Sequence, residues 1–424
     1  IRSCNIVRMS STIETRCCIA GGGPAGMMLG FLLARAGVDV CVLEKHADFL
    51  RDFRGDTIHP STLELMYELG RLEEFLKQPH QELRELGAQV GRQSLTIGDF
   101  THLPTHCKFL VFMPQWHFLN FLAEQGRRYP AFHLKMKAEA TDLLRENGRV
   151  TGLRAKTPEG PLEIRAPLTI SADGRHSTLR KCAGLEVINV GAPMDVLWMQ
   201  ISRRPGDPEQ TFGHVDAGKF FIAINRDEYW QCAFVIPKGS FDEIRARGLP
   251  ALREQIVELA PYLRDRVGEL NDWSRISLLT VAVDRLARWF LPGLLCIGDA
   301  AHAMSPVGGV GINLAIQDAV AAANILAAKL LKGMPTEDDL LAVQKRRTFP
   351  TRATQALQVF IQNRVIRRVL SGSRPIAPPW PFKLLGRFPY LRRFPARVIG
   401  LGFRPEHVRT PEAPLPKTLL PTKT

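Results

Sequence analysis

The sequence lacks several features that would assign it to common protein classes. It contains no uninterrupted apolar run of the roughly 20 residues that a membrane-spanning helix needs. It has no Cys-x-x-Cys pair and no histidine cluster at metal-ligand spacing, which argues against a zinc site. No Ser/His/Asp or paired-carboxylate pattern for hydrolytic chemistry emerges, and residues 1–14 have no apolar core typical of a secretory signal.

Disulfide bonds are not expected either, although the chain has eight cysteines. Cys17, Cys18, Cys41 and Cys296 lie in apolar, strand-like runs, where buried reduced thiols are common. A chain of 424 residues can build substantial cores without such cross-links. We therefore expect a reducing compartment and a cytoplasmic protein.

The net charge of +14 is concentrated at one end of the chain. Residues 341–424 contain 17 Lys or Arg and two acidic residues, whereas residues 1–340 contain 39 basic and 40 acidic residues. The main body is therefore close to neutral, and we expect it to bind no nucleic acid.

A glycine-rich turn lies between two predicted strands near the start. The run 16–20 is strand-like, Gly21-Gly-Gly23-Pro-Ala-Gly26 follows, an apolar helix is predicted over 27–36, and a second strand over 38–43 ends at Glu44. This arrangement is the βαβ fingerprint of a dinucleotide site, in which glycines permit a tight turn and a close approach to the pyrophosphate. The acid 18 residues after Gly26 suits an adenosine ribose. FAD and NAD remain equally open on this motif alone.

Two later motifs separate these alternatives. A strand predicted over 166–172 ends at Asp173-Gly174, and a strand over 293–297 ends at Gly298-Asp299. A glycine-rich stretch over 304–313 then leads into an apolar helix predicted over 314–331. A carboxylate at a strand end can hold a ribityl hydroxyl, and helix-start N–H groups suit the electron-rich edge of a flavin.

The three motifs occur in the order and rough spacing of the group A (single-component) FAD-dependent aromatic monooxygenases. From Arg16 to Leu331 the chain resembles this p-hydroxybenzoate hydroxylase-like family. The resemblance implies FAD as cofactor and NADH or NADPH as transient co-substrate. It also implies that oxygen adds to the reduced flavin as a C4a-hydroperoxide, which hydroxylates an aromatic, quinone-like or otherwise lipophilic small molecule.

The resemblance also implies roles for individual residues. The implied cofactor-binding residues are Gly21, Gly23, Pro24, Ala25, Gly26, Glu44, Lys45, Arg54, Gln115, Asp173, Asp299, Pro306, Gly311, Ile312 and Asn313. His302 is a weak candidate for a catalytic side chain, and a packed core histidine is the favoured alternative. No metal is expected.

The resemblance and the strand pattern together predict an α/β (α+β) fold. It consists of a discontinuous Rossmann-like FAD-binding domain, an inserted antiparallel-sheet substrate domain and a helical C-terminal segment. Strand-like runs over 196–202, 220–224 and 229–236 form the predicted sheet, with helices over 242–270 on its outside. Trp198, Phe221, Trp230 and Phe234 could line a substrate cavity in this sheet, although a core position is an equal alternative.

The predicted boundaries follow from these motifs. An N-terminal extension occupies residues 1–13. The first part of the FAD-binding domain occupies 14–190, with a small substrate-sheet insertion near 80–112, and its last part occupies 286–340. The substrate sheet occupies 191–285, and the basic segment occupies 341–424. No second strand–GxGxxG–helix unit is present, which disfavours a glutathione-reductase-like architecture.

Three other functions remain open on related folds. A flavin halogenase would carry a Trp-x-Trp-x-Ile-Pro motif, of which only the end is matched at 230–237. A prenyl-chain reductase of the geranylgeranyl-reductase type would carry Tyr-x-Trp-x-Phe-Pro, which the sequence only approximates. A non-catalytic escort-type binding protein would not need the three intact flavin motifs.

The basic segment 341–424 allows two interpretations. Ala356, Leu357, Phe360, Ile361 and Val365 recur at helical spacing, and aromatic, proline and basic residues follow over 378–394. The segment could be a helical cap on the FAD-binding domain. Alternatively, it could contact an anionic membrane surface and place the protein peripherally on the cytoplasmic membrane face.

Overall fold

A parallel sheet of six strands holds the glycine turn. The computed structural model describes residues 11–50, 57–91, 93–209, 211–216, 218–370, 372 and 380–414. The strand order is β21-β22-β13-β2-β3-β9, parallel except for the edge pair β21–β22. The strands are β21 (Phe290–Leu291), β22 (Leu294–Cys296), β13 (Leu168–Ser171), β2 (Cys17–Ala20), β3 (Val40–Leu43) and β9 (Phe132–Lys135).

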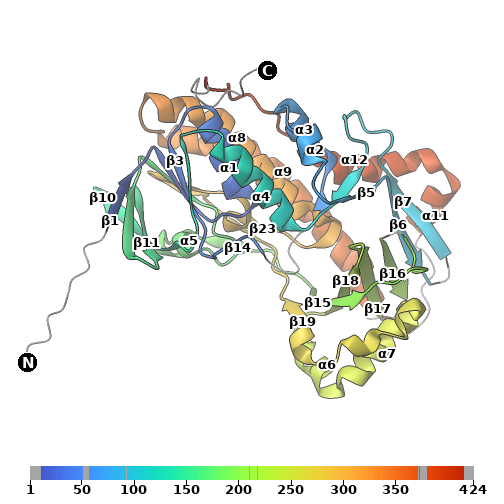
Figure 1. Cartoon of the computed structure of the whole chain (residues 1–424). Helices are drawn as coiled ribbons and strands as arrows, with labels where there is room; N and C mark the ends of the chain where they lie inside the picture. Colours follow the sequence, from blue (N-terminus) through green and yellow to red (C-terminus); the bar gives the residue numbers. More distant parts are fainter. Residues whose placement is uncertain are drawn as a thin grey trace, which may run out of the picture.

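This sheet is covered on both faces, which explains why its strands are apolar throughout rather than alternating. Ile19 and Val42 face α1 (Pro24–Arg35), α4 (Gln115–Arg127) and α8 (Val310–Lys332) in one core. Cys18 and Leu43 face the opposite way, toward a second core. That core includes a four-stranded sheet of β1 (Ser11–Glu14), β12 (Gly160–Arg165), β11 (Arg149–Thr157) and β10 (Glu139–Glu146). The three layers are visible on the left of Figure 1.

The strand β1 overlaps the end of the predicted N-terminal extension over 1–13. It pairs in parallel with β12, from Ser11 opposite Leu162 to Glu14 opposite Arg165. Because backbone hydrogen bonds with an edge strand need little sequence signal, the hydropathy pattern did not reveal it.

A seven-stranded sheet forms the other half of the molecule. Its order is β19-β15-β18-β17-β16-β6-β7, antiparallel except for the pair β16–β6. The strands are β19 (Ile276–Leu279), β15 (Met194–Ser202), β18 (Tyr229–Pro237), β17 (Lys219–Asn225), β16 (Phe212–Asp216), β6 (Glu85–Val90) and β7 (Gln93–Asp99). As predicted, helices follow over 242–270, and α6 (Phe241–Arg247) and α7 (Leu249–Leu259) cover one face of this sheet (Figure 1).

Short elements join these two halves. They are β4 (Thr57–Ile58), α2 (Pro60–Glu68), α3 (Leu72–Phe75), β5 (Gln81–Leu83), β8 (Leu110–Phe112), α5 (Thr178–Cys182), β14 (Val187–Asn189), β20 (Asp284–Leu286) and β23 (His302–Ala303). The fold is the predicted mixed α/β class, and the predicted domain boundaries stay a prediction.

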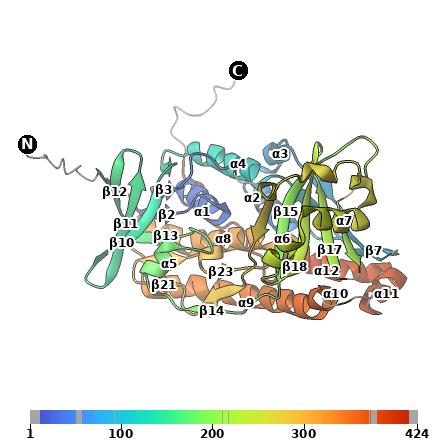
Figure 2. The same ribbon diagram turned by 90° about the horizontal axis from the view of Figure 1, so that it is seen from below.

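Two long helices follow the last strand of the parallel sheet. Among the described helices, only the stretch Val307–Lys332, which contains α8, is long and apolar enough to cross a membrane, and 72% of its most apolar window is buried inside the protein. The next helix, α9 (Glu337–Ile361), packs against α8 and continues through a π-helical turn, η6 (Gln362–Ile366), into α10 (Arg367–Leu370). Figure 2 shows α9 running from the region of β21 to the seven-stranded sheet. The chain ends with α11 (Trp380–Arg387), η7 (Pro389–Arg392) and α12 (Arg393–Leu401).

A buried ion-pair network fixes α9 against α8. The Asp318 carboxylate on α8 accepts hydrogen bonds from Arg347 Nε at 2.9 Å, from His302 Nε2 at 2.6 Å and from the Gly298 N–H at 3.1 Å. Arg347 also lies 3.3 Å from Glu406, which lies in the segment after α12. Burial alone would raise the pKa of Asp318, but His302 and Arg347 hold it below its usual value. The carboxylate is therefore charged at neutral pH.

The network predicts that Arg347 contributes much more to the stability of the protein than an exposed arginine on the same helix. Arg347→Leu should lower the free energy of unfolding by about 3–5 kcal/mol, because Asp318 would stay buried without its main cation. The matched control is Arg352→Leu, which changes an exposed arginine on the same helix and should cost less than about 0.5 kcal/mol. Urea denaturation of both variants measures the difference, and equal stabilities would contradict the assignment.

Candidate functional site

One large cavity connects the glycine turn with the seven-stranded sheet. Its volume is about 1860 Å³, which exceeds the roughly 300–1,000 Å³ of an ordinary small-molecule pocket. Its walls come from the carboxyl ends of β2, β3 and β13, the start of α8, the sheet, and the C-terminal helices. The cavity thus has room for a dinucleotide and a second molecule beside it.

The three glycines of the βαβ fingerprint meet different structural requirements at one end of this cavity. A Cβ at Gly21, where φ is +109°, would lie 2.3 Å from the Ala172 carbonyl oxygen, and a Cβ at Gly26 would lie 2.0 Å from the Gly21 oxygen. Both positions therefore need glycine for packing within the protein. A Cβ at Gly23 would meet no atom within 4 Å. Gly23 thus leaves a space beside the start of α1 that the protein itself does not fill.

The acidic end of β3 lies against the same turn. One oxygen of Glu44 accepts a hydrogen bond from the Gly22 N–H at 3.1 Å, and the other accepts one from the His46 N–H at 3.0 Å. Glu44 is buried, Lys45 is exposed, and both line the cavity together with Pro24 and Ala25. The backbone holds this carboxylate in place before any ligand is present.

Asp173 and Gln115 also line the cavity, although the Asp173 carboxylate is already engaged. It accepts hydrogen bonds from Ser171 Oγ at 2.6 Å and from the Thr178 and Leu179 N–H groups at 2.7 and 3.2 Å. Asp173 therefore shapes the loop that packs on Gly21. Gln115 is the first residue of α4 and is half-buried. Arg54, the remaining predicted residue of this end, lies outside the described residues.

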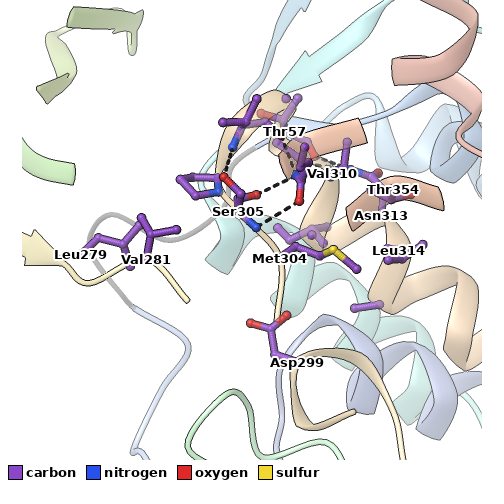
Figure 3. Close-up of a pocket in the computed structure, with 18 of the residues that line it drawn as sticks. Thr57, Leu279, Val281, Asp299, Met304, Ser305, Val310, Asn313, Leu314 and Thr354 are labelled. Carbon is purple, nitrogen blue, oxygen red and sulfur yellow. Dashed lines mark hydrogen bonds between the residues drawn. The ribbon is translucent and has the colours of Figure 1, made fainter. Parts of the chain in front are cut away.

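Asp299, the carboxylate predicted to hold the ribityl chain, lies at the edge of the cavity. It is exposed, and it lines the cavity from the short helical turn after β22. Figure 3 shows its side chain directed toward the Met304–Ser305 stretch rather than into the protein core. This carboxylate therefore lies at an open wall of the cavity.

The start of α8 forms the middle of the cavity. Pro306, Gly311, Ile312 and Asn313 all line it, as expected for a helix N-terminus with unpaired N–H groups facing a ligand. Gly308 and Gly309 both have positive φ, at 79° and 62°, which turns the chain sharply into the helix.

The Asn313 side chain holds this turn together rather than reaching into the cavity. Its oxygen accepts from the His59 N–H and the Thr62 hydroxyl, both at 2.8 Å, and its nitrogen donates to the Thr57 carbonyl at 2.9 Å (Figure 3). His59 lines the cavity beside it, and sequence reasoning missed this residue. Its Nδ1–H donates to the Ile399 carbonyl at 2.6 Å, and burial lowers its pKa to about 4. This histidine is therefore neutral at physiological pH.

His302, the weak catalytic candidate, is a structural residue. It is 1% exposed, does not line the cavity, and bonds to Asp318 in the buried network. Its position after an apolar strand matches the core alternative rather than a catalytic role.

The predicted substrate residues are corrected by the strand register. Trp198 lines the cavity, but Phe221, Trp230 and Phe234 point to the opposite face of the sheet and pack with residues of α7. Trp230 also donates to Asp207 at 2.9 Å. Because successive strand residues face opposite sides, the neighbours of these residues form the cavity wall. That wall comprises Leu86, Ala88, Val90, Ile97, Met194, Val196, Trp198, Val215, Phe220, Ile222, Ile224, Ala233, Val235 and Leu279.

The C-terminal segment completes the cavity. Four of the five apolar residues predicted for the amphipathic helix line it, namely Leu357, Phe360, Ile361 and Val365, whereas Ala356 is exposed and does not. Gln358 on the same helix holds the loop before α8: its Nε2 donates to the Ser305 and Val307 carbonyls, both at 2.9 Å, and its Oε1 accepts from the Ser305 N–H at 3.1 Å. The structure thus favours the cap interpretation, and nothing supports membrane contact. The predicted location in the cell stays a prediction.

Comparison with known proteins assigns the chain to a family. A family model described as an FAD binding domain matches residues 14–357. The 6-methylpretetramide 4-monooxygenase of Streptomyces rimosus is 32% identical over 390 residues, which are 91% of this chain and 92% of that protein.

Solved structures show the same fold. The anhydrotetracycline hydroxylase of Streptomyces rimosus has a TM-score of 0.71 at 24% identity, over 92% of this chain and 76% of that chain. The p-nitrophenol 4-monooxygenase of Pseudomonas putida has a TM-score of 0.72 at 20% identity, over 91% and 97%.

These matches do not favour the prenyl-chain reductase or the escort protein, and they confirm the resemblance seen in the three sequence motifs. The chain belongs to the FAD binding domain family, and it is an FAD-dependent oxidoreductase of the monooxygenase type.

Proposed function

We propose that this protein uses FAD, NAD(P)H and O₂ to hydroxylate an aromatic compound of more than one ring. The observation that carries the proposal is the single cavity, which joins a dinucleotide cradle to an uncharged sheet wall through the start of α8. The similarity to a 6-methylpretetramide 4-monooxygenase, together with the cavity volume, supports a multi-ring substrate.

The residues present fit FAD. The open space at Gly23 and the start of α1 would hold the pyrophosphate, with Glu44 and Lys45 beside the adenosine. Asp299 would hold the ribityl chain, and the turn from Pro306 to Asn313 would hold the ring system. Bound FAD supplies the redox chemistry, accepting a hydride from NAD(P)H and activating O₂.

The protein's own contribution is positioning and exclusion of water. The sheet wall offers apolar side chains to an aromatic ring, while Trp198 and Phe220 offer ring faces. The uncharged wall also shields oxygen chemistry from water. Within the described residues, the wall needs no acid or base of its own, because the flavin carries the reaction.

The cradle predicts that two glycine substitutions fail in different ways. Gly23→Val should fold, because φ is −76° and no protein atom lies near the new Cβ, yet it should lose nearly all bound FAD. The control Gly26→Val should fail to fold properly, since its Cβ would overlap the Gly21 oxygen. Flavin content and thermal melting separate the two outcomes. A folded Gly23→Val variant with full FAD content would refute the pyrophosphate assignment.

The loop before α8 predicts a role for Gln358 in coupling. Gln358→Leu removes the partners of three backbone groups at Ser305 and Val307, each worth about 1–3 kcal/mol when left unpaired in a buried place. We expect retained FAD but several-fold more hydrogen peroxide per NAD(P)H consumed. The control Gln362→Leu changes a buried glutamine in the π-helical turn after α9, which makes no hydrogen bond with any described residue, and it should leave stability unchanged or higher. Unchanged peroxide release in Gln358→Leu would contradict the positioning role.

The proposed reaction has a direct test. Holoenzyme should oxidise NADH or NADPH faster when a true aromatic substrate is added, and peroxide release should fall as hydroxylated product forms. Phenols, quinone precursors and polyketide-like aromatics provide the screen. Bleaching of the flavin by neither nucleotide would reject the monooxygenase assignment.

A further inference from the structure

The substrate half of the cavity has an unequal distribution of charge between its two walls. The sheet wall, from Leu86 on β6 to Leu279 on β19, contributes no charged side chain among the described residues. The four acidic residues that line the cavity are Glu44, Glu139, Asp173 and Asp299, all on the nucleotide side of the α8 turn. Apart from Arg175, which donates to the Thr280 carbonyl at 3.2 Å just beyond β19, the charged side chains that face the substrate half come from the helical wall opposite the sheet.

That helical wall carries two arginines. Ile366 on η6 packs with Val196 and Val235 on the cavity face of the sheet, and α10 lies next to β17 and β18. Beyond Gln358, the charged residues of the described helical wall are Arg364 and Arg368. Arg364 makes no hydrogen bond or ion pair with any described residue, so its guanidinium has five donors available.

The local backbone is unusual where this arginine lies. Residues Gln362–Ile366 form a π-helical turn in the middle of an otherwise α-helical run. Such turns cost stability and occur often at functional sites. In the same turn, Gln362 is fully buried, and neither end of its amide has a partner in the described protein. This turn is therefore less stable than a regular helical turn with paired side chains, as is typical of segments that bind a ligand.

We propose, on the basis of the proposed function, that Arg364 binds an anionic oxygen group of the aromatic substrate, for which a carboxylate is the simplest example. An unpaired guanidinium beside an uncharged wall selects a ligand that is apolar over most of its surface and anionic at one end. Arg364 follows Gln358 by six residues, about 9 Å along the helix axis. Because Gln358 contacts the loop before α8, the anionic end would lie away from the ring edge that faces this loop.

The test compares two probes that share one ring system, a hydroxynaphthoate and its methyl ester. Their dissociation constants are measured with holoenzyme from the change in flavin absorbance, which requires no turnover. Wild-type protein should bind the carboxylate more tightly than the ester. Arg364→Gln should weaken carboxylate binding about ten- to a hundredfold and leave ester binding unchanged.

The variants include matched controls. Arg364→Lys keeps the charge but loses the planar fork, and it should fall between wild type and Arg364→Gln. Arg367→Gln changes an exposed arginine three residues away that does not line the cavity, and it should bind both probes as wild type does. Flavin content and thermal melting confirm that each variant is folded holoenzyme.

Several results would overturn the proposal. These are no binding of the carboxylate, equal affinity of wild-type protein for both probes, or an equal loss in Arg367→Gln. NADPH binding is measured in parallel, and a loss confined to NADPH would assign Arg364 to a nucleotide phosphate instead. Failure of the proposed reaction is seen separately, as absent NAD(P)H oxidation in a protein that still distinguishes the two probes.

Discussion

The buried carboxylate of Asp318 is the constraint on which the rest of the site depends. It accepts hydrogen bonds from the turn after β22, from β23 and from α9 at once. The turn after β22 and β23 are neighbours in sequence, whereas Arg347 on α9 lies 29 residues beyond Asp318, and both the turn and α9 contribute residues to the cavity wall. A buried charge is costly unless it is paired. The network therefore contributes specificity, because only one arrangement of α8, the turn after β22, β23 and α9 satisfies the Asp318 carboxylate.

The cavity follows from that arrangement. With α8 fixed by Asp318, its N-terminus faces the same space as the N-terminus of α1, and a Cβ at Gly298 would press on both Ala25 and Ala315. The two helix ends thus lie close enough to serve one extended ligand. Gln358 then ties α9 to the loop between them, so that the helical wall and the flavin-binding turn form one hydrogen-bonded unit.

The sequence predicted the parts of this site that depend on local backbone chemistry. Gly21, Gly23 and Gly26 could be interpreted without a structure because each requirement arises within one strand–turn–helix unit. Properties that depend on distant partners were predicted less well. Arg347 lies in the basic segment 341–424, yet it is buried, because it pairs with Asp318 and Glu406. These partners lie 29 and 59 residues away in the chain, so the local sequence gives no sign of the pairing.

The prediction for the aromatic residues of the seven-stranded sheet was wrong for another reason. Both faces of that sheet are apolar, one against helices and one against the cavity. Hydropathy therefore cannot show that Phe220 faces the cavity and Phe221 faces the helices.

The helix α9 combines two demands that are usually met by separate segments. On α9, Arg347 pairs with Asp318 and Gln358 bonds to the loop before α8, whereas Arg364 lies in the π-helical turn that follows α9 and lines the cavity. This turn changes the rotation of every residue after it relative to those before. Residues beyond Gln362 can therefore be altered to suit another substrate while the contacts of Arg347 and Gln358 stay in place. This separation lets one rigid frame hold the cofactor while substrate preference is set by a few side chains at its end.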